Sequence, residues 1–78
     1  MHILLFAHLQ DAAGCARFEL NCGDVDADGL WRKLIAAHPG LARFRSSVRL
    51  AKNSEYVGAD VRFTDADEVA LIPPVSGG

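Results

Sequence analysis

The C-terminal end of the chain carries the group best placed to do chemistry, the carboxylate of Gly78. Pro73 and Pro74 stand shortly before it, and because proline cannot continue a sheet ladder, the tail should leave the body in a fixed direction. The glycines at 77 and 78 have no side chain and permit a close approach to another backbone. This ending predicts a bare carboxylate that can enter the active site of another protein; the alternative is an ordinary frayed terminus.

An acidic segment, residues 24–29 (DVDADG), matches the opening of an EF-hand calcium loop, in which alternating carboxylates and a glycine surround the ion. The twelfth position of such a loop needs a bidentate glutamate, but Ile35 stands there, and no helix is expected before Asp24. We therefore expect Asp26 to cap a helix and its acidic neighbours to face solvent.

The remaining candidate ligands and nucleophiles do not form a recognisable site. His2 and His8 are expected on one strand, about 20 Å apart at about 3.3 Å per residue, too far apart to share a metal ion. Cys15 and Cys22 lack the C-x-x-C spacing of zinc and redox sites and are expected to be reduced thiols. No serine lies in a nucleophile-elbow sequence, and no glycine-rich phosphate loop is present. We expect no metal, no bound cofactor and no internal active site.

The size and charge of the chain narrow the possible functions. Its 78 residues, at 8.4 kDa, allow one small domain with little room for a cavity. Half of the residues are hydrophobic, which favours a folded protein, and the net charge of -2 argues against a surface for nucleic acid or anionic lipid. The longest apolar run, Ile3–Ala7, is too short for a membrane helix or a signal peptide, so a cytoplasmic location is expected.

Hydrophobic periodicity predicts the elements that position the tail. Residues His2–Leu9 are expected to form a first strand, and residues 17–22, which alternate between polar and apolar, a second. The turn-like residues 11–14 between them predict a hairpin. From Asp26 the apolar residues recur at helical spacing, and the helix should end before Pro39, because a residue that precedes proline avoids the helical conformation.

A short helical turn and three strands are expected in the second half of the chain: Leu41–Phe44, then Val48–Lys52, Glu55–Val57 and Asp67–Ile72. This order indicates an α+β fold of the ubiquitin-like β-grasp type, with a mixed four- to five-stranded sheet crossed by one main helix. The last strand is apolar on both faces, which predicts a central position beside the first strand and parallel to it. We expect residues 1–74 to form the β-grasp domain and residues 75–78 a flexible Gly-Gly tail.

Residues 67–78 (DEVALIPPVSGG) closely resemble the ending of the small subunits of molybdopterin synthase, the MoaD-like sulfur carriers of molybdenum cofactor biosynthesis. The similarity covers essentially the whole chain and includes Ile3–Ala7, residues 51–53 followed by Val57, and the total length. Sulfur carriers of the thiamine pathway share the fold and the Gly-Gly ending, but they tend to be shorter and lack the Pro-Pro-Val-Ser/Thr spacer.

The resemblance implies a role for the tail residues Val75, Ser76, Gly77 and Gly78. A ubiquitin-activating-type partner enzyme would use ATP to adenylate the Gly78 carboxylate, and a persulfide sulfur donor would turn it into a thiocarboxylate. The tail would then enter the large synthase subunit and donate sulfur to the cyclic pterin precursor, precursor Z. In this family the complex is a heterotetramer, and the small subunit is the non-catalytic sulfur-donor subunit of a sulfurtransferase.

Strand alternation also predicts a partner surface on the side of the sheet opposite the helix. It consists of apolar side chains of the first and last strands and of the two prolines that follow: Leu4, Phe6, Ala70, Ile72, Pro73 and Pro74. An exposed apolar face at the root of the tail is typical of an interface, here with the large subunit. The alternative is that a loop such as Val57–Thr64 covers it.

Three other roles stay open. The chain could carry sulfur for thiamine or another pathway, or it could be a ubiquitin-like modifier that is joined through Gly78 to lysines of target proteins. It could also be a plain interaction module, for which Gly78 would be dispensable.

Overall fold

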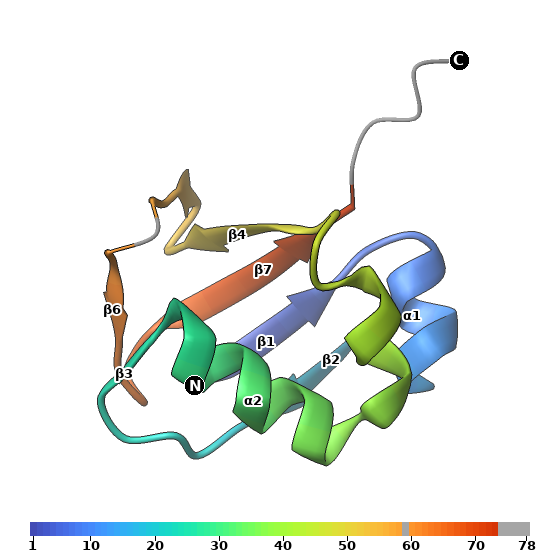
Figure 1. Ribbon diagram of the computed structural model, residues 1–78, viewed down its shortest axis with the longest axis horizontal. Helices are drawn as coiled ribbons and strands as arrows, with labels where there is room; N and C mark the ends of the chain where they lie inside the picture. Colours follow the sequence, from blue (N-terminus) through green and yellow to red (C-terminus); the bar gives the residue numbers. More distant parts are fainter. Residues whose placement is uncertain (59, 74–78) are drawn as a thin grey trace.

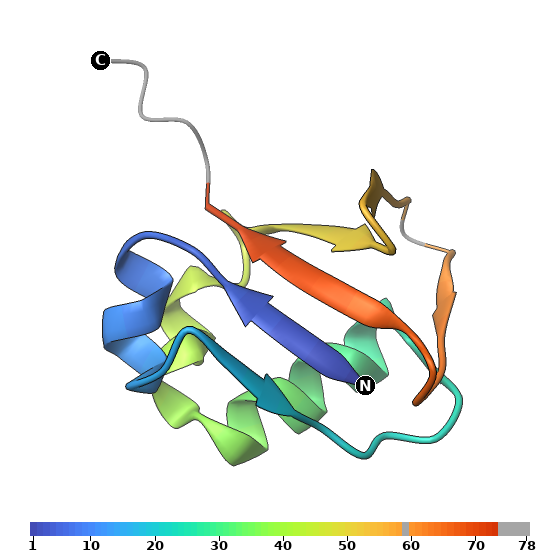
Figure 2. The same ribbon diagram turned by 180° about the vertical axis from the view of Figure 1, so that it is seen from behind.

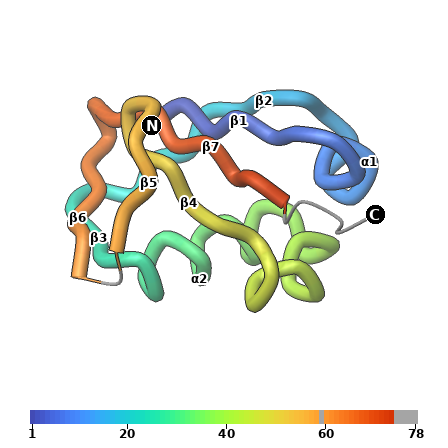
Figure 3. Tube along the Cα trace, turned by 90° about the horizontal axis from the view of Figure 1, so that it is seen from above, coloured from blue at the N-terminus to red at the C-terminus, as the bar shows by residue number. Residues whose placement is uncertain are grey.

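The computed structural model describes residues 1–58 and 60–73. A mixed sheet forms one layer, and helices form a second layer on one side of it (Figures 1 and 3). In chain order the elements are β1 (His2–Leu5), α1 (His8–Ala13), β2 (Arg17–Glu19), β3 (Val25–Asp26), α2 (Ala27–Ala37), the 3-10 helix η1 (Pro39–Phe44), β4 (Arg49–Lys52), β5 (Glu55–Tyr56), β6 (Arg62–Phe63) and β7 (Glu68–Ile72).

The main sheet has five strands in the order β2-β1-β7-β4-β5. β1 and β7 are parallel and lie next to each other in its middle, with Ile3 beside Val69 and Leu5 beside Leu71. β2 pairs antiparallel with β1, β4 pairs antiparallel with β7, and β5 pairs with β4 at the other edge. The predicted β-grasp fold and the central, parallel placement of the last strand are confirmed.

α2 packs against the inner face of this sheet, as Figure 2 shows from behind. Asp26 caps the helix as predicted, because its Oδ1 accepts a hydrogen bond of 2.8 Å from the N–H of Gly29. The helix ends at Ala37, two residues before Pro39, also as predicted. The core joins the helices to the inner sheet face and consists of Met1, Ile3, Leu5, Leu9, Leu30, Trp31, Leu34, Leu41, Val48, Leu50, Phe63, Val69 and Leu71.

The first strand is shorter than predicted. It ends at Leu5, and α1 begins at His8, so the expectation that His8 continues the strand is wrong. Ala7 lies between the two elements with a φ of 53° and a ψ of -134°, a backbone conformation that interrupts an extended strand. The predicted hairpin is wrong as a connection: β1 and β2 are antiparallel neighbours, but α1 links them and ends at Gly14, which is left-handed with a φ of 79°.

The structure contains two short strands that the sequence pattern does not predict. β3 and β6 pair antiparallel, with Val25 beside Phe63, and form a second, two-stranded sheet.

η1 confirms the helical turn predicted at Leu41–Phe44. It lies against α1 so closely that a Cβ on Gly40 would be 2.7 Å from the carbonyl oxygen of Ala12. Glycine at this position therefore permits the contact between η1 and α1.

The start of β7 is fixed by the buried carboxylate of Asp67. Its oxygens accept hydrogen bonds from the backbone N–H of Thr64 at 2.8 Å and from the side-chain amide of Asn53 at 3.1 Å. The Lys52 ammonium lies 3.6 Å away. The bond from the Thr64 N–H is the largest of the influences that hold the pKa of Asp67 below its usual value; the Asn53 amide and Lys52 add to it.

Candidate partner-binding face

The sheet face opposite α2 is called the outer face, and no helix in the described part of the chain covers it (Figures 2 and 3). Its side chains stand in rows that follow the cross-strand register. The central row crosses all five strands and consists of Arg17, Leu4, Ala70, Ala51 and Tyr56. The apolar members of this row are therefore neighbours in space although they come from both halves of the chain.

An apolar hollow of about 320 Å³ lies in the outer face. Phe6 and Tyr56, which remain 45% and 60% exposed, both line it. None of the described residues in the segment Val57–Thr64 lines the hollow, which favours an open face over coverage by that loop. The other apolar residues around it are Leu4, Ala51, Ala70 and Ile72.

Charged side chains border the apolar hollow at its two ends. At one end, Arg49 lies beside Ile72 in the register, and its guanidinium carbon is 4.6 Å from the centre of the Tyr56 ring. At the other end, His2 stands in the register between Glu68 and Glu19.

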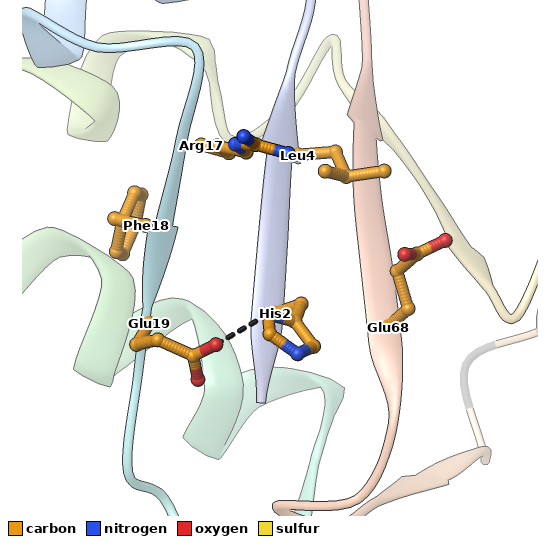
Figure 4. A pocket seen from close by; sticks show the side chains of 6 residues that line it. All are labelled: His2, Leu4, Arg17, Phe18, Glu19 and Glu68. Carbon is orange, nitrogen blue, oxygen red and sulfur yellow. Dashed lines mark ion pairs between the residues drawn. The ribbon is translucent and has the colours of Figure 1, made fainter.

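A second hollow, of about 340 Å³, opens at the end of the outer face that carries Glu19 and Glu68 (Figure 4). Nδ1 of His2 forms an ion pair with Glu19 there, and Arg17 and Glu68 also line it. An apolar centre with a charged border is the composition of a protein–protein interface. The face is thus suited to recognition of a partner.

The structure brings together four of the residues predicted for the interface, Leu4, Phe6, Ala70 and Ile72, because β1 and β7 are adjacent and in register. Pro73 follows β7 and is partly buried. Pro74 and the predicted tail residues Val75, Ser76, Gly77 and Gly78 lie outside the described residues. The sequence pattern does not assign Arg17, Arg49, Ala51 or Tyr56 to this face. Arg49 and Ala51 nevertheless flank the buried Leu50 in strict alternation.

The carboxylates of the acidic segment 24–29 have partners other than an ion. Asp24 pairs with Nε of Arg62 at 3.1 Å, and Asp28 pairs with Arg45 and, at 2.9 Å, with Arg32. The hydrogen bond from Arg45 is the main cause that lowers the pKa of Asp28. With Asp26 engaged as the helix cap, the segment has a structural role.

The thiols and imidazoles are dispersed over the fold. Cys15 and Cys22 are both free. Burial is the main cause that raises the pKa of the Cys22 thiol, and the nearby carboxylate of Asp65 adds to it. The fraction of Cys22 in the reactive thiolate form is therefore reduced. In residues 1–58 and 60–73, no three His, Cys, Asp or Glu side chains are placed to hold a metal ion. No described helix is long and apolar enough to cross a membrane.

The five-stranded mixed sheet, with parallel β1 and β7 in its middle and one main helix packed against it, places the chain in the ubiquitin-like β-grasp class. The chain belongs to the ThiS family, whose model matches residues 3–78. Within this class it is similar to a molybdopterin synthase sulfur carrier subunit from Chlamydomonas reinhardtii, with 38% identity over 97% of this chain and 95% of the relative. The resemblance to the small subunits of molybdopterin synthase, expected from the sequence, is confirmed.

Solved structures share the fold over almost the full length. SAMP1, the small archaeal modifier protein 1, from Haloferax volcanii has a TM-score of 0.79 and 32% identity, and the match covers 100% of this chain and 98% of that one. A chain from a complex of subunits 1 and 2 of the molybdopterin-converting factor of Helicobacter pylori has a TM-score of 0.63. At 22% identity, over 99% of this chain and 96% of that one, this second similarity concerns the fold alone.

Proposed function

We propose that this protein is the sulfur carrier subunit of a molybdopterin synthase and that it acts in the cytoplasm. The full-length similarity to proteins of that name carries the proposal. The open outer face supports it, because a carrier must be held by other proteins while its end reacts. The protein is a co-substrate in this scheme, and the active sites belong to its partners.

The reaction takes place at the carboxylate of Gly78. A free carboxylate resists nucleophiles because of its charge and its poor leaving group. In an activating enzyme of the ubiquitin-activating type, the carboxylate attacks the α-phosphate of ATP, which releases pyrophosphate and gives an acyl adenylate. A persulfide of a donor enzyme then displaces AMP, and a thiol reduces the resulting acyl disulfide to the thiocarboxylate.

The charged carrier next docks on the large synthase subunit through its outer face. The thiocarboxylate sulfur forms a C–S bond to the cyclic pterin precursor, precursor Z, and displaces an oxygen substituent. Water then cleaves the acyl–sulfur bond, so the sulfur stays on the pterin and the tail leaves as the carboxylate, ready for another cycle. The interface consists of Leu4, Phe6, Ala70, Ile72, Pro73 and Pro74, and Val75, Ser76 and Gly77 span the distance to the reacting Gly78. No cofactor is bound by the carrier, and ATP is consumed by the activating enzyme.

The test is reconstitution with the activating enzyme, ATP and a persulfide donor, followed by intact-mass measurement. We expect a mass gain equal to the replacement of one oxygen by sulfur, and conversion of precursor Z when the large subunit is added. Deletion of Gly78, or addition of one residue after it, should abolish both results, whereas Lys33→Glu on the exposed side of α2 should leave them unchanged. Full activity of the variant without Gly78 would rule out a carrier.

A second function, that of a ubiquitin-like modifier, is favoured by the similarity to small archaeal modifier protein 1. The two functions use the same activated carboxylate but different nucleophiles, since a modifier is attacked by a lysine of its target. Conjugates of higher mass in cell extracts, lost on deletion of Gly78, would identify a modifier. A third outcome is also possible: a thiazole-forming enzyme, and not the large synthase subunit, accepts the sulfur of the thiocarboxylate. That result would assign the protein to thiamine biosynthesis.

A further inference from the structure

The charges of the outer face have opposite signs at the two ends of β7. Arg49 lies beside Ile72, at the end where the tail begins, and Glu68 stands at the other end of the strand with His2 and Glu19 next to it. The four residue steps between Ile72 and Glu68 correspond to about 13 Å of strand. The apolar hollow, which Glu68 itself lines, thus extends between Ile72 beside Arg49 and the end that carries Glu68. Arg17 adds a positive charge in the central row, beside Leu4 on β2.

Three charges of the outer face have no ion-pair partner within the described part of the chain: Arg49 at one end, Glu68 at the other, and Arg17 on the edge strand β2. Elsewhere Asp24, Asp28 and Asp67 are each paired with a basic side chain. The Arg49 guanidinium is also held in place, because it lies over the Tyr56 ring at 4.6 Å. A guanidinium fixed by its π face keeps its N–H donors in the plane, where they can bind a carboxylate bidentately.

We propose that the outer face binds a protein surface of opposite charge pattern: a carboxylate opposite Arg49, an apolar centre, and a basic side chain opposite Glu68. This inference rests on the proposed function and describes the chemistry of the large-subunit surface that receives the carrier. Apolar contact alone has little directional preference, because turning the sheet by 180° would bury a similar apolar area. The charges remove that ambiguity, because the reversed orientation would place like charges together.

Orientation matters because the tail begins at only one end of β7. In the correct orientation the segment after Ile72 starts beside the Arg49 contact, and in the reversed orientation it starts on the opposite side of the interface. The residues Arg49 and Glu68 are therefore specificity determinants, while Phe6, Leu4 and Ile72 supply the buried apolar area.

Binding kinetics with the purified large subunit of molybdopterin synthase from the same organism test this proposal. Arg49→Glu and Glu68→Arg should each lower the association rate and the affinity by about tenfold at low salt. The loss should shrink as the salt concentration rises from about 0.05 to about 0.5 M, because screening removes the charge effect. Lys33→Glu, an exposed site on α2 with the same charge change as Arg49→Glu, should stay within about twofold of the wild type.

Each result separates this inference from the proposed function. If the wild type binds and all three variants bind equally well, the charge pattern does not orient the complex, although the carrier function stands. If the wild type does not bind the large subunit at all, both proposals are wrong. Self-association of the wild type that is lost in Arg49→Glu would assign the face to a second copy of this chain and overturn the inference; thermal unfolding of each variant verifies its fold.

Discussion

Replacement of Phe6 by aspartate should abolish binding to the large subunit and leave the fold intact. Phe6 lies beyond the end of β1, is 45% exposed and does not belong to the buried core. A phenylalanine side chain has about 200 Å² of surface, so about 90 Å² remains to be buried by a partner. At about 25 cal/mol per Å² this area contributes about 2 kcal/mol, or a factor of about 30 in affinity. The buried aspartate would add the cost of removing a charge from water.

Calorimetry with the purified large subunit measures this loss. Phe6→Leu is the matched control, since it keeps most of the apolar area and should weaken binding by less than about tenfold. Thermal unfolding should show that Phe6→Asp changes the free energy of unfolding by less than about 1 kcal/mol. Ile72→Asp, on the same face, should behave in the same way. A folded Phe6→Asp variant that binds with wild-type affinity would refute the assignment of the outer face as the interface.

Two further predictions concern stability. Gly40→Ala should destabilise the protein by about 2 kcal/mol in thermal unfolding, because the new Cβ would lie 2.7 Å from the backbone oxygen of Ala12. Gly58→Ala is the control and should be nearly neutral, because the nearest atom to its new Cβ is 3.5 Å away. The lowered pKa of Asp67 contributes stability that is present above the ordinary aspartate pKa and is lost as the pH falls through the lowered value. Acid unfolding should therefore be less steep in Asp67→Asn than in the wild type, although the variant is less stable at neutral pH; equal slopes would contradict this account.

The parts of the fold with a long or strict pattern could be predicted from the sequence. α2 has an N-cap, an apolar stripe and a terminating proline, and β7 is apolar on both faces. The end of β1 was harder to predict, because the apolar run continues past Leu5 to Ala7. Nothing in that run indicates the positive φ of Ala7, which interrupts the strand. α1 is too short to show a helical period, and β3 and β6 exist only because distant segments meet.

Part of the outer face could also be predicted, because side chains alternate strictly between the two faces of a strand. Leu4, Phe6, Ala70 and Ile72 follow from strand alternation once β1 and β7 are placed side by side. Tyr56 needs more information, because its position depends on the register of β5 against β4 and of β4 against β7. Such registers are set by the turn and by packing.

The parallel pairing of β1 with β7 has a consequence for how the protein is made. It joins His2 to Glu68 and Leu5 to Leu71, so the centre of the sheet cannot form until residues 68–71 have left the ribosome. Until then the outer face is incomplete, because Glu68, Ala70 and Ile72 come from β7. A chain without β7 would therefore lack the central strand that joins the two halves of the outer face.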